Sequence, residues 1–219
     1  MFQRDYILRM IEMMGDLMRR VKELMDELAR MRLLEEACRR QCGLPLSALE
    51  TLSTESLTEL LSPTPRLFAS ELIYLRATAS PSLWEEGRML RLKSLRLLLT
   101  LAQEGPLCEL RAARVQALKL ELMDLLLPED LMACAAFLRQ GGAYADMEDA
   151  LFEAAERCAP QERAACVREG GCMLREAAPA EDLAFGRTSA HELRLSAREL
   201  EARWAADDSQ QPDRGEETR

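Results

Sequence analysis

Apolar residues recur at alternating steps of four and three along the first thirty positions of the chain. This spacing places their side chains on one face of an α-helix. A second row of apolar side chains widens that face beyond a simple coiled-coil seam, as in helix bundles. The pattern predicts one amphipathic helix over residues 1–43, ended by Gly43 and Pro45. The face consists of Ile7, Ile11, Met14, Met18, Val21, Met25 and Leu28, and the second row of Met10, Leu17, Leu24 and Met31.

Such a face is too costly to leave in water. About seven side chains at roughly 1.5–3 kcal/mol each equal the whole stability of a typical domain. We expect the same chain to cover the face, because residues 66–127 form helices that are apolar around much of their girth. A second copy of the helix, giving a homodimer, and a foreign partner are the alternatives. The methionines would suit an adaptable docking surface, but we favour the filling of an irregular core.

Proline, glycine and capping signals divide the rest of the chain into further helices. Residues 44–62 predict short helical turns that are capped by Ser53 or Thr54. We expect Leu57, Leu60 and Leu61 to face inward there. Further helices are expected at about 65–79, 83–104, 107–127, 129–140, 143–158, 160–169 and 189–205.

Two Gly-Gly pairs, at 141–142 and 170–171, are expected to end helices. Ser189 and Glu192 have the spacing of a capping box that opens the last helix. No segment alternates as a β-strand does, so the predicted fold class is all-α. The predicted parts are an N-terminal helix at 1–43, a helical bundle at 44–127, helical hairpins with a C-terminal helix at 128–206, and a disordered acidic and polar tail at 207–219.

Composition and charge narrow the function classes. Aromatic residues make up 5% of the chain, so Leu, Ala and Met must fill the core. The net charge of −9 repels phosphate backbones, and we expect no nucleic-acid partner. No apolar run reaches the length of a membrane span, and the first residues lack the pattern of a signal peptide. The expected location is the cytoplasm, with no membrane partner.

Residues 131–160 resemble a degenerate tetratricopeptide hairpin, in which two helices pack around a tight turn. Gly142 would occupy the turn and need a positive φ, and Pro160 would lie near the end of the repeat. Met147 stands where the motif usually has Ala, and Leu131 stands where a large aromatic residue is common. The inward-facing positions are Leu131, Cys134, Ala135 and Leu138 on the first helix, and Tyr144, Met147, Leu151 and Ala154 on the second.

A second resemblance covers most of residues 2–205. The opening FQRDYILRMIE (Phe2 to Glu12), the block GLPLSALETLSTESLTELL and the turn described above resemble a bacterial family of helical proteins, a domain of unknown function. The resemblance implies a cytosolic all-α protein with tetratricopeptide-like hairpins behind an N-terminal helix. It assigns no functional residue.

Candidate catalytic groups are few. His191 is the one histidine of the sequence, and we interpret it as a solvated residue. Glu153 and Glu156 match half of the carboxylate motif by which all-α nucleotide pyrophosphohydrolases bind magnesium, but the second half is missing. We therefore predict no catalytic residue.

The seven cysteines are scattered through predicted helices, which does not indicate a disulfide framework. Cys38 and Cys42 lie one helical turn apart, which would suit a metal or redox pair. Cys158, Cys166 and Cys172 lack the short spacing of structural zinc knuckles. We interpret the cysteines as small buried apolar groups, and we predict no metal and no cofactor.

Two hypotheses of function follow. The leading one is a non-catalytic, tetratricopeptide-like module that binds a protein or peptide in a groove between its hairpins. The alternative is a magnesium- or manganese-dependent hydrolase whose carboxylate site is too generic to see in the sequence.

Overall fold

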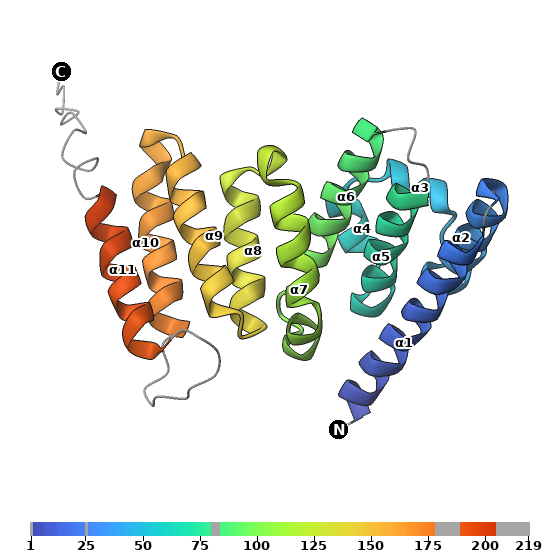
Figure 1. The fold of residues 1–219 in the computed structure, drawn as a ribbon, viewed down its shortest axis with the longest axis horizontal. Coiled ribbons are helices and arrows are strands. Elements are labelled where there is room, and N and C mark those ends of the chain that lie inside the picture. Colours follow the sequence, from blue (N-terminus) through green and yellow to red (C-terminus); the bar gives the residue numbers. More distant parts are fainter. Residues whose placement is uncertain (1, 25, 80–83, 178–188, 205–219) are drawn as a thin grey trace, which may run out of the picture. The chain divides into compact units, whose positions relative to one another are not determined.

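The computed structural model describes residues 2–24, 26–79, 84–177 and 189–204, and within them it has eleven α-helices, one 3-10 helix and no strand (Figure 1). The predicted all-α fold class is confirmed. Contacts divide the chain into two compact units, Met1–Leu126 and Leu127–Arg219. The predicted segments 1–43 and 44–127 therefore belong to the same unit. The tail at 207–219 lies outside the described residues.

The first unit contains seven α-helices and the 3-10 helix in its described part. They are α1 (Phe2–Glu23), α2 (Glu27–Cys42), α3 (Leu46–Thr51), α4 (Thr54–Leu60), α5 (Pro63–Ala79), α6 (Trp84–Leu99), α7 (Gly105–Glu121) and η1 (Met123–Leu125). The described part of the second unit contains α8 (Pro128–Gln140), α9 (Tyr144–Arg157), α10 (Pro160–Ala177) and α11 (Ala190–Trp204).

Residues 1–43 form two helices, so the prediction of one continuous helix is wrong. Asp26 caps the start of α2, because its carboxylate accepts hydrogen bonds from the backbone N–H groups of Leu28 and Ala29, each at 3.2 Å. The Arg30 Nε donates to the Leu24 carbonyl at 2.7 Å and holds the turn. The apolar spacing continues through the break, and periodicity alone therefore conceals it.

The same chain covers the α1 part of the predicted face. Met14 and Val21 are buried, as is Met10 of the second row, and Ile11 and Met18 are half-buried. Leu28 is 68% exposed, so its assignment to the face is wrong: the break rotates α2 relative to the register of α1. The Ile7 side chain and Met25 lie outside the described part of the structure.

Helix α5 is the centre of the first unit. It contacts α1, α2, α3 and α6, and seven consecutive residues from Leu67 to Ile73 are buried. A helix buried on all sides needs apolar or internally bonded residues around its whole girth. Ser70 and Ser94 meet this need, because each hydroxyl donates to the other's backbone carbonyl, at 3.0 and 2.8 Å. The small side chains also bring α5 and α6 close together.

Residues 44–62 form two short helices. The Ser53 hydroxyl accepts from the Ser56 N–H at 3.1 Å, which confirms Ser53 as a cap. Leu57 and Leu61 are buried as predicted, but Leu60 is 62% exposed and its inward placement is wrong. Leu57 lies on the buried side of α4, and Leu61 is the extended residue that follows the helix, whereas Leu60, the last residue of α4, lies on its exposed side.

Helices α8 and α9 of the second unit form the predicted hairpin. The side chains of Leu131, Cys134, Leu138, Met147, Leu151 and Ala154 are at most 1% exposed, together with Ala135; Tyr144 is half-buried. Gly142 has a φ of +73°, which confirms the predicted left-handed turn. Its N–H donates to the Arg139 carbonyl at 3.1 Å. Whether this hairpin is a tetratricopeptide repeat stays a prediction.

The two glycines of this turn provide a matched test. Gly142→Ala is expected to destabilise the second unit by about 1 kcal/mol, because an L-residue is strained at positive φ. Gly141 has a φ of −83°, and Gly141→Ala should be neutral or slightly stabilising. Urea denaturation followed by circular dichroism measures both. Equal losses at the two positions would contradict the backbone explanation.

Helix α10 runs through Gly170 and Gly171, so the prediction that this pair ends a helix is wrong. The glycines instead allow close packing: a Cβ on Gly170 would lie 3.0 Å from Leu200 Cδ2, and one on Gly171 would lie 2.6 Å from Glu201 Oε1. Leu200 and Glu201 belong to α11. Helices α10 and α11 can therefore approach each other more closely than larger side chains would allow.

The predicted capping box of the last helix is present. The Ser189 N–H donates to Glu192 Oε2 at 2.6 Å, and the Glu192 N–H donates to the Ser189 hydroxyl at 3.2 Å. His191 in the same turn is exposed, as expected for a solvated residue.

Candidate binding groove

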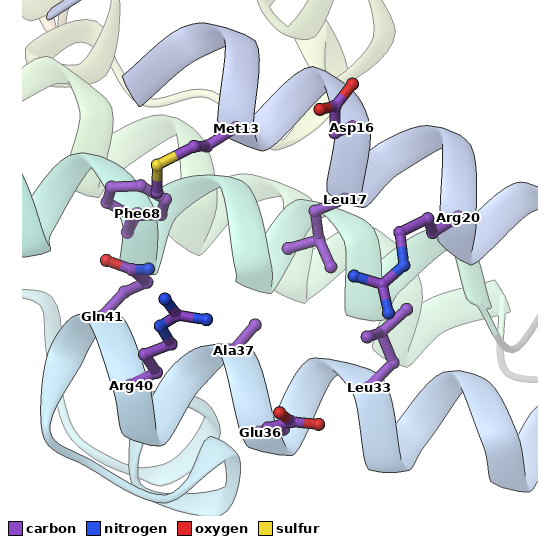
Figure 2. A pocket seen from close by; sticks show the side chains of 10 residues that line it. All are labelled: Met13, Asp16, Leu17, Arg20, Leu33, Glu36, Ala37, Arg40, Gln41 and Phe68. Carbon is purple, nitrogen blue, oxygen red and sulfur yellow. The ribbon is translucent and has the colours of Figure 1, made fainter. Parts of the chain in front are cut away.

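A groove runs between α1 and α2, which lie antiparallel (Figure 2). Its cavity of about 280 Å³ has an apolar base made by Leu17 of α1, Leu33 and Ala37 of α2, and the buried Phe68 of α5. The Met13 side chain reaches toward the Phe68 ring at one end (Figure 2). The rim is formed by the exposed charged residues Asp16, Arg20, Glu36 and Arg40 and by the half-buried Gln41.

The groove continues toward the turn between the two helices. A second hollow, of about 490 Å³, shares Arg20, Leu33 and Glu36 with the first and reaches Leu24 and Ala29. At 1.5 Å per residue, the α1 wall from position 13 to its end at position 23 is about 15 Å long. This length matches about three turns of an incoming helix.

Two arginines on opposite walls point into the groove (Figure 2). Within the described part of the chain, the guanidinium groups of Arg20 and Arg40 make no hydrogen bond and no ion pair. The arginines that precede them in the sequence pair with nearby carboxylates instead: Arg19 pairs with Asp16, and Arg39 pairs with Glu35 at 2.6 Å. The groove therefore offers two unpaired guanidinium groups, which are suited to bidentate binding of carboxylates.

A shallower surface lies on the other side of α2, against α3. Leu28, Met31 and Leu46 contribute its apolar part, in a hollow of about 620 Å³. Its central carboxylate is already used, because Glu35 accepts from the Leu46 N–H at 2.8 Å as well as from Arg39. The backbone hydrogen bond, followed by the one from Arg39, lowers the pKa of Glu35.

A buried carboxylate joins α5 to α7. Glu71 is 3% exposed, and its oxygens lie 3.0 Å from the Arg111 Nε and 3.6 Å from an Arg114 Nη. The Arg114 guanidinium also lies 4.1 Å from the centre of the Tyr74 ring. Burial lowers the pKa of Arg111, although Glu71 opposes that shift. Since both oxygens face arginines inside the fold, Glu71 is an internal tie between helices.

The cysteines are all free thiols. A thiol–thiol hydrogen bond raises the pKa of Cys42 and lowers that of Cys38, and burial raises the pKa of Cys108 to about 11. In the second unit Cys172 is exposed, whereas Cys158 is buried and Cys166 is half-buried. Among the described residues, no three or more His, Cys, Asp or Glu side chains are grouped so as to hold a metal ion.

The glutamates that matched half of a magnesium motif lie on α9. Glu153 is half-buried and Glu156 is exposed.

None of the described helices is long and apolar enough to cross a membrane.

Comparison with protein-family models, curated proteins and solved structures finds no match for this chain. The two resemblances drawn from the sequence therefore stay predictions. The sequence did not predict the groove. Arg20, Arg40 and Phe68 belong to no motif. Glu36 lies four residues before Arg40, a spacing that predicts an ion pair in which the charge of Arg40 is neutralised. The capping residue Asp26, which separates α1 from α2 and so lets them lie antiparallel, is the signal that could have indicated the groove.

Proposed function

We propose that this protein is a non-catalytic interaction module, and that the groove between α1 and α2 binds an amphipathic helical segment of another protein. The observation that carries the proposal is the pair of unpaired arginines above an open apolar base. A helix laid into a groove between two helices completes a three-helix arrangement, a common mode of peptide recognition.

The apolar base sets one half of the partner's chemistry. Leu17, Leu33 and Ala37 are half-buried, so part of their surface remains open to solvent. Apolar side chains spaced three and four residues apart on an incoming helix would cover this strip. The cost of ordering the groove is small, because Phe68 below it is already fixed in the core.

The arginines set the other half. A charge-assisted hydrogen bond is worth about 1.5–3 kcal/mol when a partner group would otherwise be left unpaired. Acidic residues beside the apolar stripe would meet Arg20 and Arg40 and fix the direction of the bound helix. The tetratricopeptide-like hairpins proposed for residues 128–206 would be a separate binding region.

Site-specific photo-crosslinking in the source cells tests the proposal. A photoreactive amino acid in place of Ala37, at the base of the groove, is expected to capture a segment with an apolar stripe and flanking acids. The same amino acid in place of Arg39, which is exposed and directed at Glu35, is the matched control and should capture far less. A synthetic peptide of the captured segment then allows affinity to be measured by fluorescence anisotropy.

Substitution of the groove arginines is expected to weaken that peptide. Arg20→Gln and Arg40→Gln should each raise the Kd about tenfold or more, because each removes a charge-assisted contact. Arg19→Gln and Arg39→Gln, at adjacent positions paired with their own carboxylates, should change the Kd less than about threefold. Equal crosslinking at positions 37 and 39, or equal effects of the four substitutions, would refute the proposal. Capture of a second copy of the chain would favour the homodimer instead.

A further inference from the structure

In the second unit, Cys166 lies beside sulfur-containing side chains of two other segments. Cys166 of α10 places its Sγ 3.7 Å from the Sδ of Met132 on α8. Cys158, at the C-terminal end of α9, hydrogen-bonds the Cys166 thiol. The three residues are 26 and 8 positions apart in the sequence, so only the packing of α8, α9 and α10 brings them together.

The cluster is held in place by the backbone. The Cys158 N–H donates to the Ala154 carbonyl at 3.0 Å, closing the last turn of α9. The Arg163 side chain then donates to the carbonyls of Cys158 and Ala155, at 2.9 and 3.0 Å. This clamp fixes the end of α9 against the start of α10, and Cys166 lies about 1.7 turns along α10 from its first residue.

We propose that Cys158, Cys166 and Met132 form a binding site for a soft monovalent metal ion, Cu(I). Metal–sulfur bonds of about 2.3 Å place the sulfurs of a trigonal site about 4 Å apart, close to the spacing found between Cys166 and Met132. A thioether ligand favours Cu(I) over zinc, which in structural sites takes four ligands from cysteine, histidine and carboxylate.

The burial of the three side chains suits a metal ion that must be sheltered from water but must also be able to reach the site. Cys158 is 6% exposed, whereas Cys166 and Met132 are half-buried and provide a path from solvent. Binding is a ligand exchange without electron transfer: each cysteine forms a sulfur–copper bond and releases its proton to water. Burial, followed by the hydrogen bond that the Cys166 thiol donates to Cys158, raises the pKa of Cys166 to about 12.

Anaerobic competition with the chromophoric Cu(I) chelator bicinchoninate tests the site on the reduced full-length protein. The wild type is expected to retain one Cu(I) that Cys166→Ser does not retain, and Met132→Leu should weaken retention about tenfold or more. Cys172→Ser, on the same helix as Cys166 but exposed, is the matched control and should bind as the wild type does. Circular dichroism shows that each variant is folded; if Cys158→Ser unfolds, the half-buried Cys166 and Met132 still provide the test.

Three outcomes would overturn the proposal. One is the absence of any copper retained against the chelator. Another is retention that falls with Cys38→Ser or Cys172→Ser as much as with Cys166→Ser, since the metal would then be bound by other thiols. The third is binding that does not change with Met132→Leu, which would reduce the site to a thiol pair.

Discussion

Glu71→Gln is expected to destabilise the first unit by about 3–5 kcal/mol, a large part of the stability of a typical domain. The substitution keeps the shape of the side chain but removes the negative charge between two arginines. Arg111 and Arg114, whose side chains are 14% and 22% exposed, would then repel each other in a poorly solvated place. Their charge cannot be removed by deprotonation at neutral pH.

Fluorescence can isolate this unit. The chain has two tryptophans, Trp84 at the start of α6 and Trp204 at the end of α11. In a Trp204→Phe background the remaining tryptophan belongs to the first unit, and its urea denaturation reports the stability of that unit. Glu50→Gln is the control, because Glu50 pairs with Arg76 at 2.8 Å but is more exposed than Glu71, and its loss should be within about 1 kcal/mol.

A double substitution separates the loss of the ion pair from the loss of packing. Glu71→Leu with Arg111→Met removes one charge of each sign, and should be less destabilising than the sum of the two single substitutions. Additive losses would mean that Glu71 does not interact with Arg111 in the folded state. A Glu71→Gln protein as stable as the wild type would contradict the whole account of this tie.

The parts of the fold that local chemistry determines were predictable from the sequence. Ser53 and Ser189 cap helices because the serine hydroxyl can accept a hydrogen bond from a backbone N–H of the first helical turn, which has no partner within the helix. Gly142 turns the chain because a left-handed residue costs least at glycine. The hairpin positions between Leu131 and Ala154 follow from helical periodicity, which a tight turn then aligns.

The failures came where a long-range contact changed the meaning of a local signal. Gly170 and Gly171 have the residue type of a helix end, but α11 packs against them and they stay helical. Asp26 is a strong helix cap, but the apolar spacing continues without a break on both sides of it. That spacing therefore favoured one continuous helix over two. The groove depends on this break, and the sulfur cluster on the packing of α8 against α10. Neither site was visible in the spacing of its residues.

Helix α1 supports the final prediction. Val21→Asp is expected to unfold the first unit or to cost at least about 4 kcal/mol, because Val21 is 3% exposed and belongs to the main apolar cluster of that unit. Leu28→Asp, seven residues later in the same apolar pattern but 68% exposed, is the matched control and should leave the urea midpoint unchanged. In the apolar spacing of the sequence, Val21 and Leu28 are equivalent positions.

The pH dependence of this loss identifies its cause. A carboxyl group introduced among apolar side chains has a raised pKa in the folded state and so binds its proton more tightly there than in the unfolded chain. The penalty relative to the wild type is therefore complete above the folded-state pKa. It shrinks as the pH falls toward the unfolded value of about 3.9. A penalty independent of pH would indicate lost packing alone.

Sedimentation of the same variants distinguishes an internal helix from a dimer interface. If α1 is held only by its own chain, the wild type and Leu28→Asp have the same mass, and Val21→Asp loses its fluorescence-detected folded state. A wild-type dimer that Val21→Asp converts to a folded monomer would mean that a second copy covers Val21, which contradicts the burial found within the chain. A dimer that only Leu28→Asp dissociates would instead place the interface on the exposed side of α2.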